Sequence, residues 1–431
     1  MPERSFLSDI LQRVAVGARL SRGKTAVDIG TLCDELLSDK GEASGLATAM
    51  QILDTFESLE NDKQAAFFMD IANRFGVDET ALQSAISGWK AGDDYAARKL
   101  HYAAEPKSQE LIRRLNRVPG ATARLVTMRS VLLEHLKTHP ELSGIDTDFR
   151  HLFSSWFSRG FLEIRRINWS TPAEILEKII TYEAVHEITG WDDLRQRVAA
   201  PDRKLFAFFH PAIPTEPLIF VEVALTTNVS SAVGSILARD RTPINPASAT
   251  TAVFYSISNC QSGLRGISFG NFLIKQVVSE LAAELPALKT FVTLSPTPEL
   301  RKWAESLAGA ELTDLMRESI ANAKADIPPT MIAEITARYL LLAKRASGTV
   351  YDPVAHFHLG NGAILHRVNV NADLSPQGIK NAWGVMVNYL YDGKKIEANH
   401  QAYATEHQVA ASPEVRVMAG LPKKLMGDKN V

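Results

Sequence analysis

The sequence predicts an all-helical first part followed by a larger mixed α/β domain, and two observations support this division. Apolar residues recur at helical spacing through residues 1–158, where alternating β-branched runs are nearly absent. After Ser158-Arg159-Gly160 the segment from Phe161 to Trp169 alternates as a strand does, and strand and helix patterns then follow one another. We therefore expect a helical bundle over residues 1–158, serving oligomerisation or interaction, and an α/β domain over residues 159–431.

The helices of the first part are predicted from apolar residues at positions i, i+3, i+4 and i+7. Glycine and proline separate these segments, as at Gly76, Gly92 and Pro119-Gly120. The predicted helices are 5–20, 28–37, 43–59, 63–75, 79–89, 108–115, 121–136 and 143–157.

The second part mixes short β-branched or alternating runs with longer helical patterns. Its most regular helix is expected from Asn271 to Leu285, and further helices between Glu299 and Ala346. This alternation is typical of a sheet with helices on its faces. The predicted strands are 161–169, 205–209, 218–226, 251–257, 291–294, 364–370 and 385–391.

Composition excludes several classes of protein. The 431 residues are 45% hydrophobic and 22% charged, with a formal net charge of -2, so a polycation that binds nucleic acid is not expected. Cys33 and Cys260 are the only cysteines, which excludes a disulfide framework and favours a reducing compartment. No apolar run approaches the ~20 residues that cross a bilayer. We expect a cytoplasmic protein without a membrane partner.

A glycine-spaced loop stands between a predicted strand and a predicted helix. Gly263, Gly266 and Gly270 allow positive φ and close approach of the backbone to a ligand. Loop amides together with a helix N-terminus favour phosphate or pyrophosphate, and Arg265 would add a charged contact. The spacing is neither a Walker loop nor a dinucleotide fingerprint, so an ordinary strand-to-helix connection remains the alternative.

The same loop contains Gly266-Ile267-Ser268-Phe269-Gly270, which matches the G-x-S-x-G pattern of hydrolases. In those enzymes the nucleophilic serine follows a strand directly. Here the predicted strand ends near Ser258, well before Ser268, and the pattern also arises by chance. A nucleophile at Ser268 is therefore the less favoured interpretation.

Two further segments carry groups suited to catalysis. Ser295 stands at the end of a short apolar strand, where sites in α/β sheets collect, although the residues alone favour a helix cap or a local turn. His356 and His358 would point to the same side of an extended segment, as metal ligands do, but no second cluster of ligands accompanies them. A histidine there also has a pKa suited to proton transfer.

Long blocks of the second part resemble the malonyl-CoA decarboxylase family. They are GFLEIRRINWSTPAEILEKI, YEAVHEITGWDDL, EPLIFVEVALT, FYSIS-x-x-QSGL-x-G, LSPTP and PVAHFHLGNGAILHRVN, in consistent order from about Gly160 to Tyr391. The resemblance implies an acetyltransferase-like (GNAT) catalytic domain after the helical part. It implies conversion of malonyl-CoA to acetyl-CoA and CO2 without a metal or other cofactor, by a homo-oligomer, tetramer or dimer.

The resemblance also assigns site residues. Ser295 in LSPTP and His358 in FHLGNGA match the family's catalytic serine and histidine. The segment matching the family's malonyl-CoA-binding loop is Arg265, Gly266, Ile267, Ser268, Phe269, Gly270 and Asn271. Ser268 departs from the family pattern, which has a glutamate at this position, so the resemblance leaves its role open.

The chemistry leaves two routes and two rival functions open. Loss of CO2 from a malonyl thioester leaves an enolate, which a Ser295–His358 pair would protonate, or the serine would attack the thioester. A Ser–His acyl-CoA hydrolase would use the same residues and release free CoA. A non-catalytic acyl-CoA sensor would keep the fold without turnover.

Overall fold

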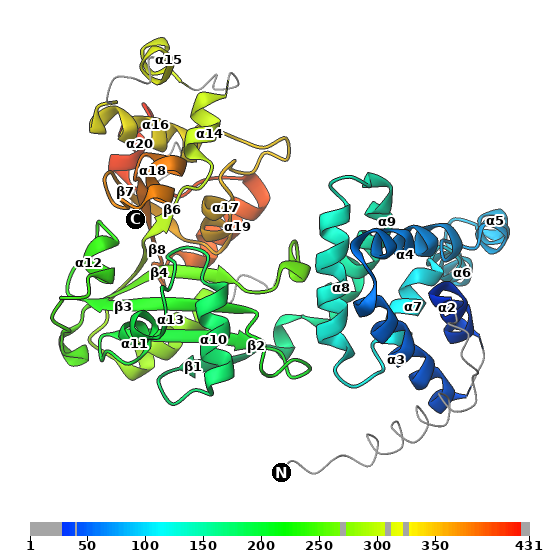
Figure 1. Cartoon of the computed structure of the whole chain (residues 1–431). Coiled ribbons are helices and arrows are strands. Elements are labelled where there is room, and N and C mark those ends of the chain that lie inside the picture. Colours follow the sequence, from blue (N-terminus) through cyan, green and yellow to red (C-terminus); the bar gives the residue numbers. More distant parts are fainter. Residues whose placement is uncertain (1–27, 39–40, 268–272, 307–311, 322–326, 424–431) are drawn as a thin grey trace. The chain divides into compact units, whose positions relative to one another are not determined.

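The computed structural model describes residues 28–38, 41–267, 273–306, 312–321 and 327–423 (Figure 1). The chain divides into two compact units. Unit 1 comprises Met1–Leu162, His210–Pro214 and Gln261–Ser268, and unit 2 comprises Glu163–Phe209, Thr215–Cys260 and Phe269–Val431. Unit 1 is helical and unit 2 is mixed α/β, which confirms the predicted fold class.

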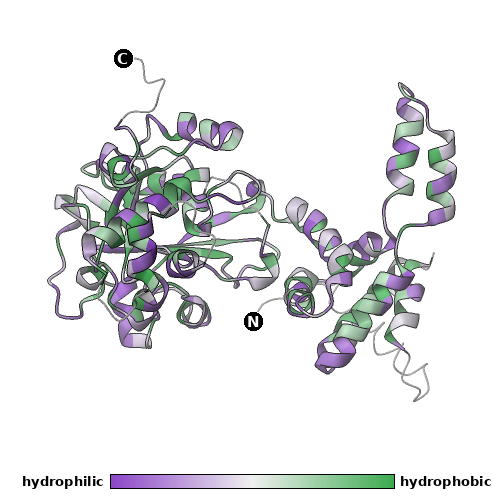
Figure 2. Cartoon of the chain, turned by 90° about the horizontal axis from the view of Figure 1, so that it is seen from above, coloured by the Kyte–Doolittle hydropathy of each residue, from purple (hydrophilic) through white to green (hydrophobic). Residues whose placement is uncertain are grey.

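Most helices of unit 1 place apolar residues in a buried core. Figure 2 shows green and purple sides on these helices, as amphipathic sequences require. Leu32, Phe68, Leu125 and Phe153 are fully buried in this core. Its helices are α2 (Ile29–Leu37), α3 (Glu42–Ser58), α4 (Asn61–Arg74), α5 (Glu79–Gly88), α6 (Asp94–Ala103), α7 (Lys107–Leu115), α8 (Ala121–His135) and α9 (Ser143–Trp156), with the 3-10 turns η1 (Pro140–Leu142), η2 (Arg159–Phe161) and η4 (Ser262–Leu264). The core is formed by α2, α3, α4, α7, α8 and α9, whereas α5 has no buried residue and α6 only Ala96.

Unit 2 is organised around one mixed sheet, which has eight strands among the described residues. Its order is β1-β2-β3-β4-β5-β8-β6, with β7 paired to β8, and only β4 and β5 pair in parallel. Unit 2 therefore has the mixed α/β sheet that the sequence predicts. The strands are β1 (Glu163–Ile167), β2 (Arg203–Phe209), β3 (Ile219–Thr226), β4 (Thr251–Asn259), β5 (Thr290–Thr293), β6 (Ser295–Pro296), β7 (Ile364–Asn369) and β8 (Met386–Leu390).

Helices cover this sheet and bury its central strands. One core cluster joins Ile179 of α10 and Leu194 of α11 to Leu205 of β2 and Phe220 of β3 (Figure 1). The helices of unit 2 are α10 (Ala173–Tyr182), α11 (Trp191–Val198), α12 (Gly234–Leu237), α13 (Leu273–Glu284), α14 (Leu300–Glu305), α15 (Asp314–Ala321), α16 (Pro329–Leu342), α17 (Pro353–Gly360), α18 (Pro376–Ala382), α19 (Ile396–Glu406) and α20 (Pro413–Met418), with the 3-10 turn η3 (Pro246–Ser248).

The parallel strands β4 and β5 separate after four residue pairs. Their pairing ends at Phe254 and Thr293, and β4 then continues to Asn259 without β5 beside it. The chain leaves β5 at Leu294 and enters β6 at Ser295, which pairs with Val387 of β8. The carboxyl end of β5 is therefore the place where the sheet opens.

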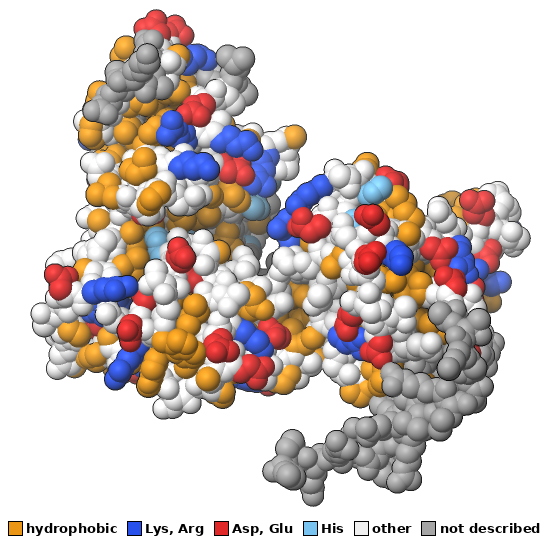
Figure 3. Space-filling view, viewed as in Figure 1, with side chains coloured by type: hydrophobic (Ala, Val, Ile, Leu, Met, Phe, Trp, Pro, Cys, Tyr) orange, Lys and Arg blue, Asp and Glu red, His pale blue; other side chains and the backbone are white. Residues whose placement is uncertain are grey.

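The molecular surface is mixed in charge. Figure 3 shows acidic and basic side chains interspersed over the viewed face of each unit, in line with the net charge of -2. Within the described ranges, no helix is both long and apolar enough to span a bilayer.

Candidate functional site

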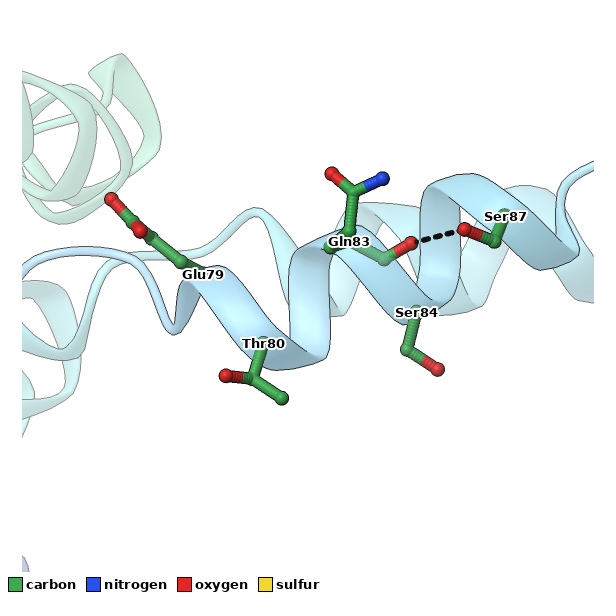
Figure 4. Close-up of a pocket in the computed structure, with 5 residues that line it drawn as sticks. All are labelled: Glu79, Thr80, Gln83, Ser84 and Ser87. Carbon is green, nitrogen blue, oxygen red and sulfur yellow. Dashed lines mark hydrogen bonds between the residues drawn. The ribbon is translucent and has the colours of Figure 1, made fainter.

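A shallow pocket lies on α5, away from every residue that the sequence singles out. Figure 4 shows Glu79, Thr80, Gln83, Ser84 and Ser87 lining it, all from this one helix. The Ser87 hydroxyl donates to the carbonyl of Gln83 at 2.8 Å, so part of its polarity is satisfied locally. This pocket holds no pairing of nucleophile, acid and base, whereas the opening of the sheet does.

Ser295 is placed by the end of β5 and by pairing to β8. Pro296 and Pro298 follow it, and proline, which lacks a backbone N–H, ends regular strand pairing there. The side chain is 6% exposed. A buried hydroxyl at this position needs partners, and the structure supplies two.

The first partner of Ser295 is His358, which comes from helix α17. Expecting an extended segment here was wrong. Asp352 caps the helix by accepting from the backbone N–H groups of Val354 and Ala355, at 2.9 and 2.8 Å, and Pro353 occupies the first turn.

Because residues two apart in a helix point in different directions, His356 and His358 do not face one another. His356 bonds through Nδ1 to the Tyr403 hydroxyl at 2.8 Å, while His358 faces Ser295. The interpretation of these two histidines as paired metal ligands is therefore wrong. Throughout the described part of the chain, no group of three or more His, Cys, Asp or Glu side chains is arranged to hold a metal ion.

Three side chains form a buried hydrogen-bonded chain. Ser295 Oγ lies 3.0 Å from His358 Nε2, and His358 Nδ1 lies 2.9 Å from the Tyr391 hydroxyl. The imidazole also stacks on the Tyr389 ring, with 4.6 Å between centroids. His358 is 2% exposed and Tyr391 3%. The third member is thus a phenol rather than the carboxylate of a serine hydrolase triad.

The sequence contained no local signal for Tyr391. It directly follows β8, and the pairing of β8 with β7, the strand after α17, brings it to a histidine 33 residues earlier. Its partnership with His358 could have been found only by knowing the pairing of distant strands.

Burial sets the protonation of this chain. It lowers the pKa of His358 to about 3 and raises the pKa of Tyr391 well above its usual value. At neutral pH the imidazole is therefore uncharged and the phenol keeps its proton. The hydrogen-bonded series of Tyr391, His358 and Ser295 can therefore move a proton without holding a buried charge in its resting state.

A pH-dependent contribution to stability follows from the lowered pKa of His358. Between pH 3 and the ordinary value of 6.5 the unfolded chain binds more protons than the folded one, so the parent loses unfolding free energy as the pH falls. His358→Asn removes this contribution. We expect urea unfolding at about pH 7 and about pH 5 to show a smaller loss of unfolding free energy in the variant than in the parent. Equal losses in the two proteins would contradict the assignment.

The described part of the glycine-spaced loop packs against helix α8 of unit 1. The Gly263 carbonyl accepts from the Arg129 guanidinium at 2.6 Å, and the Ser262 and Ser130 hydroxyls lie 2.6 Å apart. A Cβ on Gly263 would lie 1.9 Å from the Val126 carbonyl oxygen. This glycine is therefore required by close packing on a helix.

Gly266 differs from Gly263, because it combines a φ of +78° with no neighbour closer than 3.8 Å to a Cβ placed there. Arg265, Gly266 and Ile267 belong to unit 1, whereas Ser295 and His358 belong to unit 2. The remaining predicted loop residues, Ser268, Phe269, Gly270 and Asn271, lie outside the described residues.

Two family models match consecutive parts of the chain. Residues 75–157 match the malonyl-CoA decarboxylase N-terminal domain, and residues 160–429 match the malonyl-CoA decarboxylase C-terminal domain. The chain belongs to the malonyl-CoA decarboxylase family. The resemblance seen in the sequence blocks is confirmed, and the match extends into the helical part.

Curated relatives and solved structures agree with this family. The chain is 32% identical to mitochondrial malonyl-CoA decarboxylase of Rattus norvegicus, over 95% of this chain and 90% of the relative. It is 36% identical to the mitochondrial enzyme of Anser anser anser, over 74% of this chain and 71% of the relative.

Two solved malonyl-CoA decarboxylases superpose closely on this fold. That of Rhodopseudomonas palustris has a TM-score of 0.86 at 48% identity, covering 90% of this chain and 98% of that one. That of Agrobacterium vitis has a TM-score of 0.85 at 49% identity, covering 91% and 100%. Membership of the family and its two-part architecture thus rest on sequence and fold together.

Proposed function

We propose that this chain is a carboxy-lyase that converts malonyl-CoA to acetyl-CoA and CO2, with Ser295 and His358 delivering the proton that the reaction consumes. The observation that supports this mechanism is the buried chain from Tyr391 through His358 to Ser295, at the point where β4 and β5 separate. The resemblance of the LSPTP and FHLGNGA blocks to the family implies the same roles for Ser295 and His358.

The chemistry of the substrate explains why a proton donor is needed. Breaking the bond between the malonyl α-carbon and its carboxylate releases CO2 and leaves the electron pair as a thioester enolate. The enolate carbon is a strong base and needs a proton at once. General acids contribute roughly 10²–10⁴-fold to such steps.

Four proton transfers balance the reaction. The Ser295 O–H bond breaks as a C–H bond forms on the enolate carbon, and His358 Nε2 gives its proton to the serine oxygen. The phenol of Tyr391 gives its proton to His358 Nδ1, and the phenolate is reprotonated from solvent. The transfers from Tyr391 to His358 and from His358 to Ser295 span contacts of the structure, at 2.9 and 3.0 Å, and solvent supplies the proton that restores the phenol.

We further propose that the segment from Arg265 to Asn271 binds the phosphates of the CoA ester. Gly266 has a positive φ, and the Arg150 guanidinium lies 3.8 Å from a Cβ placed on it. Both features support this proposal, since such turns expose backbone N–H groups that bind anions. We expect Gly266→Val to weaken acetyl-CoA binding roughly ten-fold or more, measured by calorimetry.

Gly92→Val is the matched control for this variant. Gly92 has a φ of +85° and open space around it, so valine strains the backbone in the same way. It lies between α5 and α6, outside the loop. Equal loss of binding in both variants, or none in Gly266→Val, would exclude the loop as the phosphate site.

Three products decide between the proposed function and its rivals. The purified chain is incubated with malonyl-CoA, and CO2, acetyl-CoA and free CoA are followed over time. Equal amounts of CO2 and acetyl-CoA are expected. Free CoA without CO2 would show a hydrolase, and binding without turnover would show an acyl-CoA sensor.

We also propose a homo-oligomer, a tetramer or dimer, that works in the cytoplasm and assembles through residues 1–158, with residues 159–431 as its catalytic domain. Trp89, Tyr95 and Tyr102 are 49, 69 and 73% exposed on and beside the α5–α6 pair, which supports an interaction role for this part. Both cysteines are free and buried, which fits a reducing compartment. Light scattering on the full chain tests the assembly, and a monomer at micromolar concentration would contradict it.

A further inference from the structure

We propose that Thr293 is a positioning residue whose hydroxyl sets the direction of the hydrogen bond between Ser295 and His358. This inference rests on the proposed decarboxylation, because it says why the serine delivers a proton rather than attacking the thioester. Thr293 is the last residue of β5, is fully buried, and lies two residues before Ser295. Residues two apart in an extended segment face the same side.

The hydroxyl oxygen of Thr293 accepts two hydrogen bonds. Ser295 Oγ donates to it at 2.9 Å, and the backbone N–H of Tyr389 donates to it at 3.2 Å. A hydroxyl oxygen has two lone pairs, so both are occupied. The single proton of the Ser295 hydroxyl is therefore held toward Thr293.

This arrangement decides which group donates in the remaining contacts. Because the Ser295 hydroxyl donates its hydrogen bond to Thr293, Ser295 Oγ is the acceptor in the 3.0 Å contact with His358. His358 Nε2–H is then the donor of that contact. A neutral imidazole carries one N–H, so His358 Nδ1 accepts from the Tyr391 hydroxyl. All donors then point the same way, from Tyr391 through His358 and Ser295 to Thr293.

The direction has a chemical consequence. With its proton on Nε2, His358 can give a proton through Ser295 but cannot remove the proton of the serine. A nucleophilic serine needs the opposite direction, with an unprotonated nitrogen facing the hydroxyl. Thr293 thus favours protonation of the enolate over attack on the thioester.

The backbone carbonyl of Thr293 is held by a hydrogen bond from Asn388. Asn388, fully buried on β8, donates through Nδ2 to the carbonyl of Thr293 at 2.8 Å and to that of Ser230 at 3.1 Å. Its Oδ1 accepts from Arg367 Nε at 3.1 Å and Asn369 Nδ2 at 2.8 Å. With its amide held by four bonds, Asn388 keeps the Thr293 hydroxyl in place beside Ser295.

The test compares Thr293→Val, which keeps the shape and removes the hydroxyl, with Thr293→Ser, which keeps the hydroxyl. In the valine variant we expect kcat to fall roughly ten-fold or more, KM to stay within about two-fold, and the share of free CoA among the products to rise. The serine variant should stay within about three-fold of the parent kcat. Thr336→Val, another fully buried threonine, on α16, controls for the substitution and should leave both values unchanged.

A direct measurement of the tautomer separates this proposal from the proposed function. In ¹⁵N-histidine-labelled full chain, the resonance missing from His358→Asn identifies His358, and its shifts report which nitrogen carries the proton. We expect Nε2–H in the parent and in Thr293→Ser, and Nδ1–H in Thr293→Val. Nδ1–H in the parent, or an unchanged tautomer in Thr293→Val, would overturn the role of Thr293 whether or not the chain decarboxylates malonyl-CoA.

Discussion

Ser295→Ala and His358→Asn are each expected to lower kcat on malonyl-CoA by about 10²-fold or more, the scale of a lost general acid. The double variant should be no slower than the slower single variant, because the two groups act on one proton and their losses do not multiply. Steady-state kinetics of the three proteins, with folding checked by circular dichroism, measures this.

His356→Asn is the matched control for the histidine variant. His356 comes from the same helix, is partly buried and bonds to Tyr403, outside the chain of Ser295 and His358. It should keep nearly the parent kcat. If Ser295→Ala or His358→Asn were as active as this control, the assigned site would be wrong.

Asp352→Ala is expected to destabilise the fold strongly, because it removes the buried cap of α17. The fully buried carboxylate accepts from Val354 N–H, Ala355 N–H and, at 2.9 Å, the Tyr339 hydroxyl. Alanine leaves two buried donors, the Ala355 N–H and the Tyr339 hydroxyl, and the part-buried Val354 N–H unpaired, and each buried unpaired group costs about 1–3 kcal/mol. We expect the unfolding free energy from urea titration to fall by about 3 kcal/mol or more, and kcat to fall because α17 carries His358.

Asp78→Ala shows whether this loss is specific to a buried cap. Asp78 caps α5 by accepting from the Ala81 N–H at 3.0 Å, but it is exposed, so water replaces the lost bond. Its loss of stability should be a small fraction of that of Asp352→Ala. Similar losses would mean that burying the donors bound by Asp352 adds little to the cost of losing the cap.

The sequence predicted helices best where one side of the helix is apolar. In α4, α7 and α9 the apolar spacing and the separating glycine and prolines marked the elements. The prediction missed α6 because only Ala96 of that helix is buried, so no apolar stripe marks it. It missed α17 because the apolar residues of that helix are spread around its axis, so no apolar stripe marks it. Asp352-Pro353 is nevertheless a helix start that could have been recognised.

Half of the site could be predicted and half could not. Ser295 stands out because a strand ends there, and family resemblance paired it with His358. Thr293 stands two residues before Ser295, but its bond to the Tyr389 N–H needs the pairing of β8 beside β5, about 95 positions away. Tyr391 reaches His358 only because β8 pairs with β7, which follows α17. Local patterns carry no information on such contacts.

The most direct test of the central claim, that Ser295 carries a proton and not an acyl group, is the mass of the intact protein during turnover. The chain is mixed rapidly with malonyl-CoA, quenched in acid at successive times and weighed, while acetyl-CoA is measured in parallel. We expect acetyl-CoA to form with no acylated protein at any time. An acyl adduct that appears before acetyl-CoA and is absent in Ser295→Ala would contradict it.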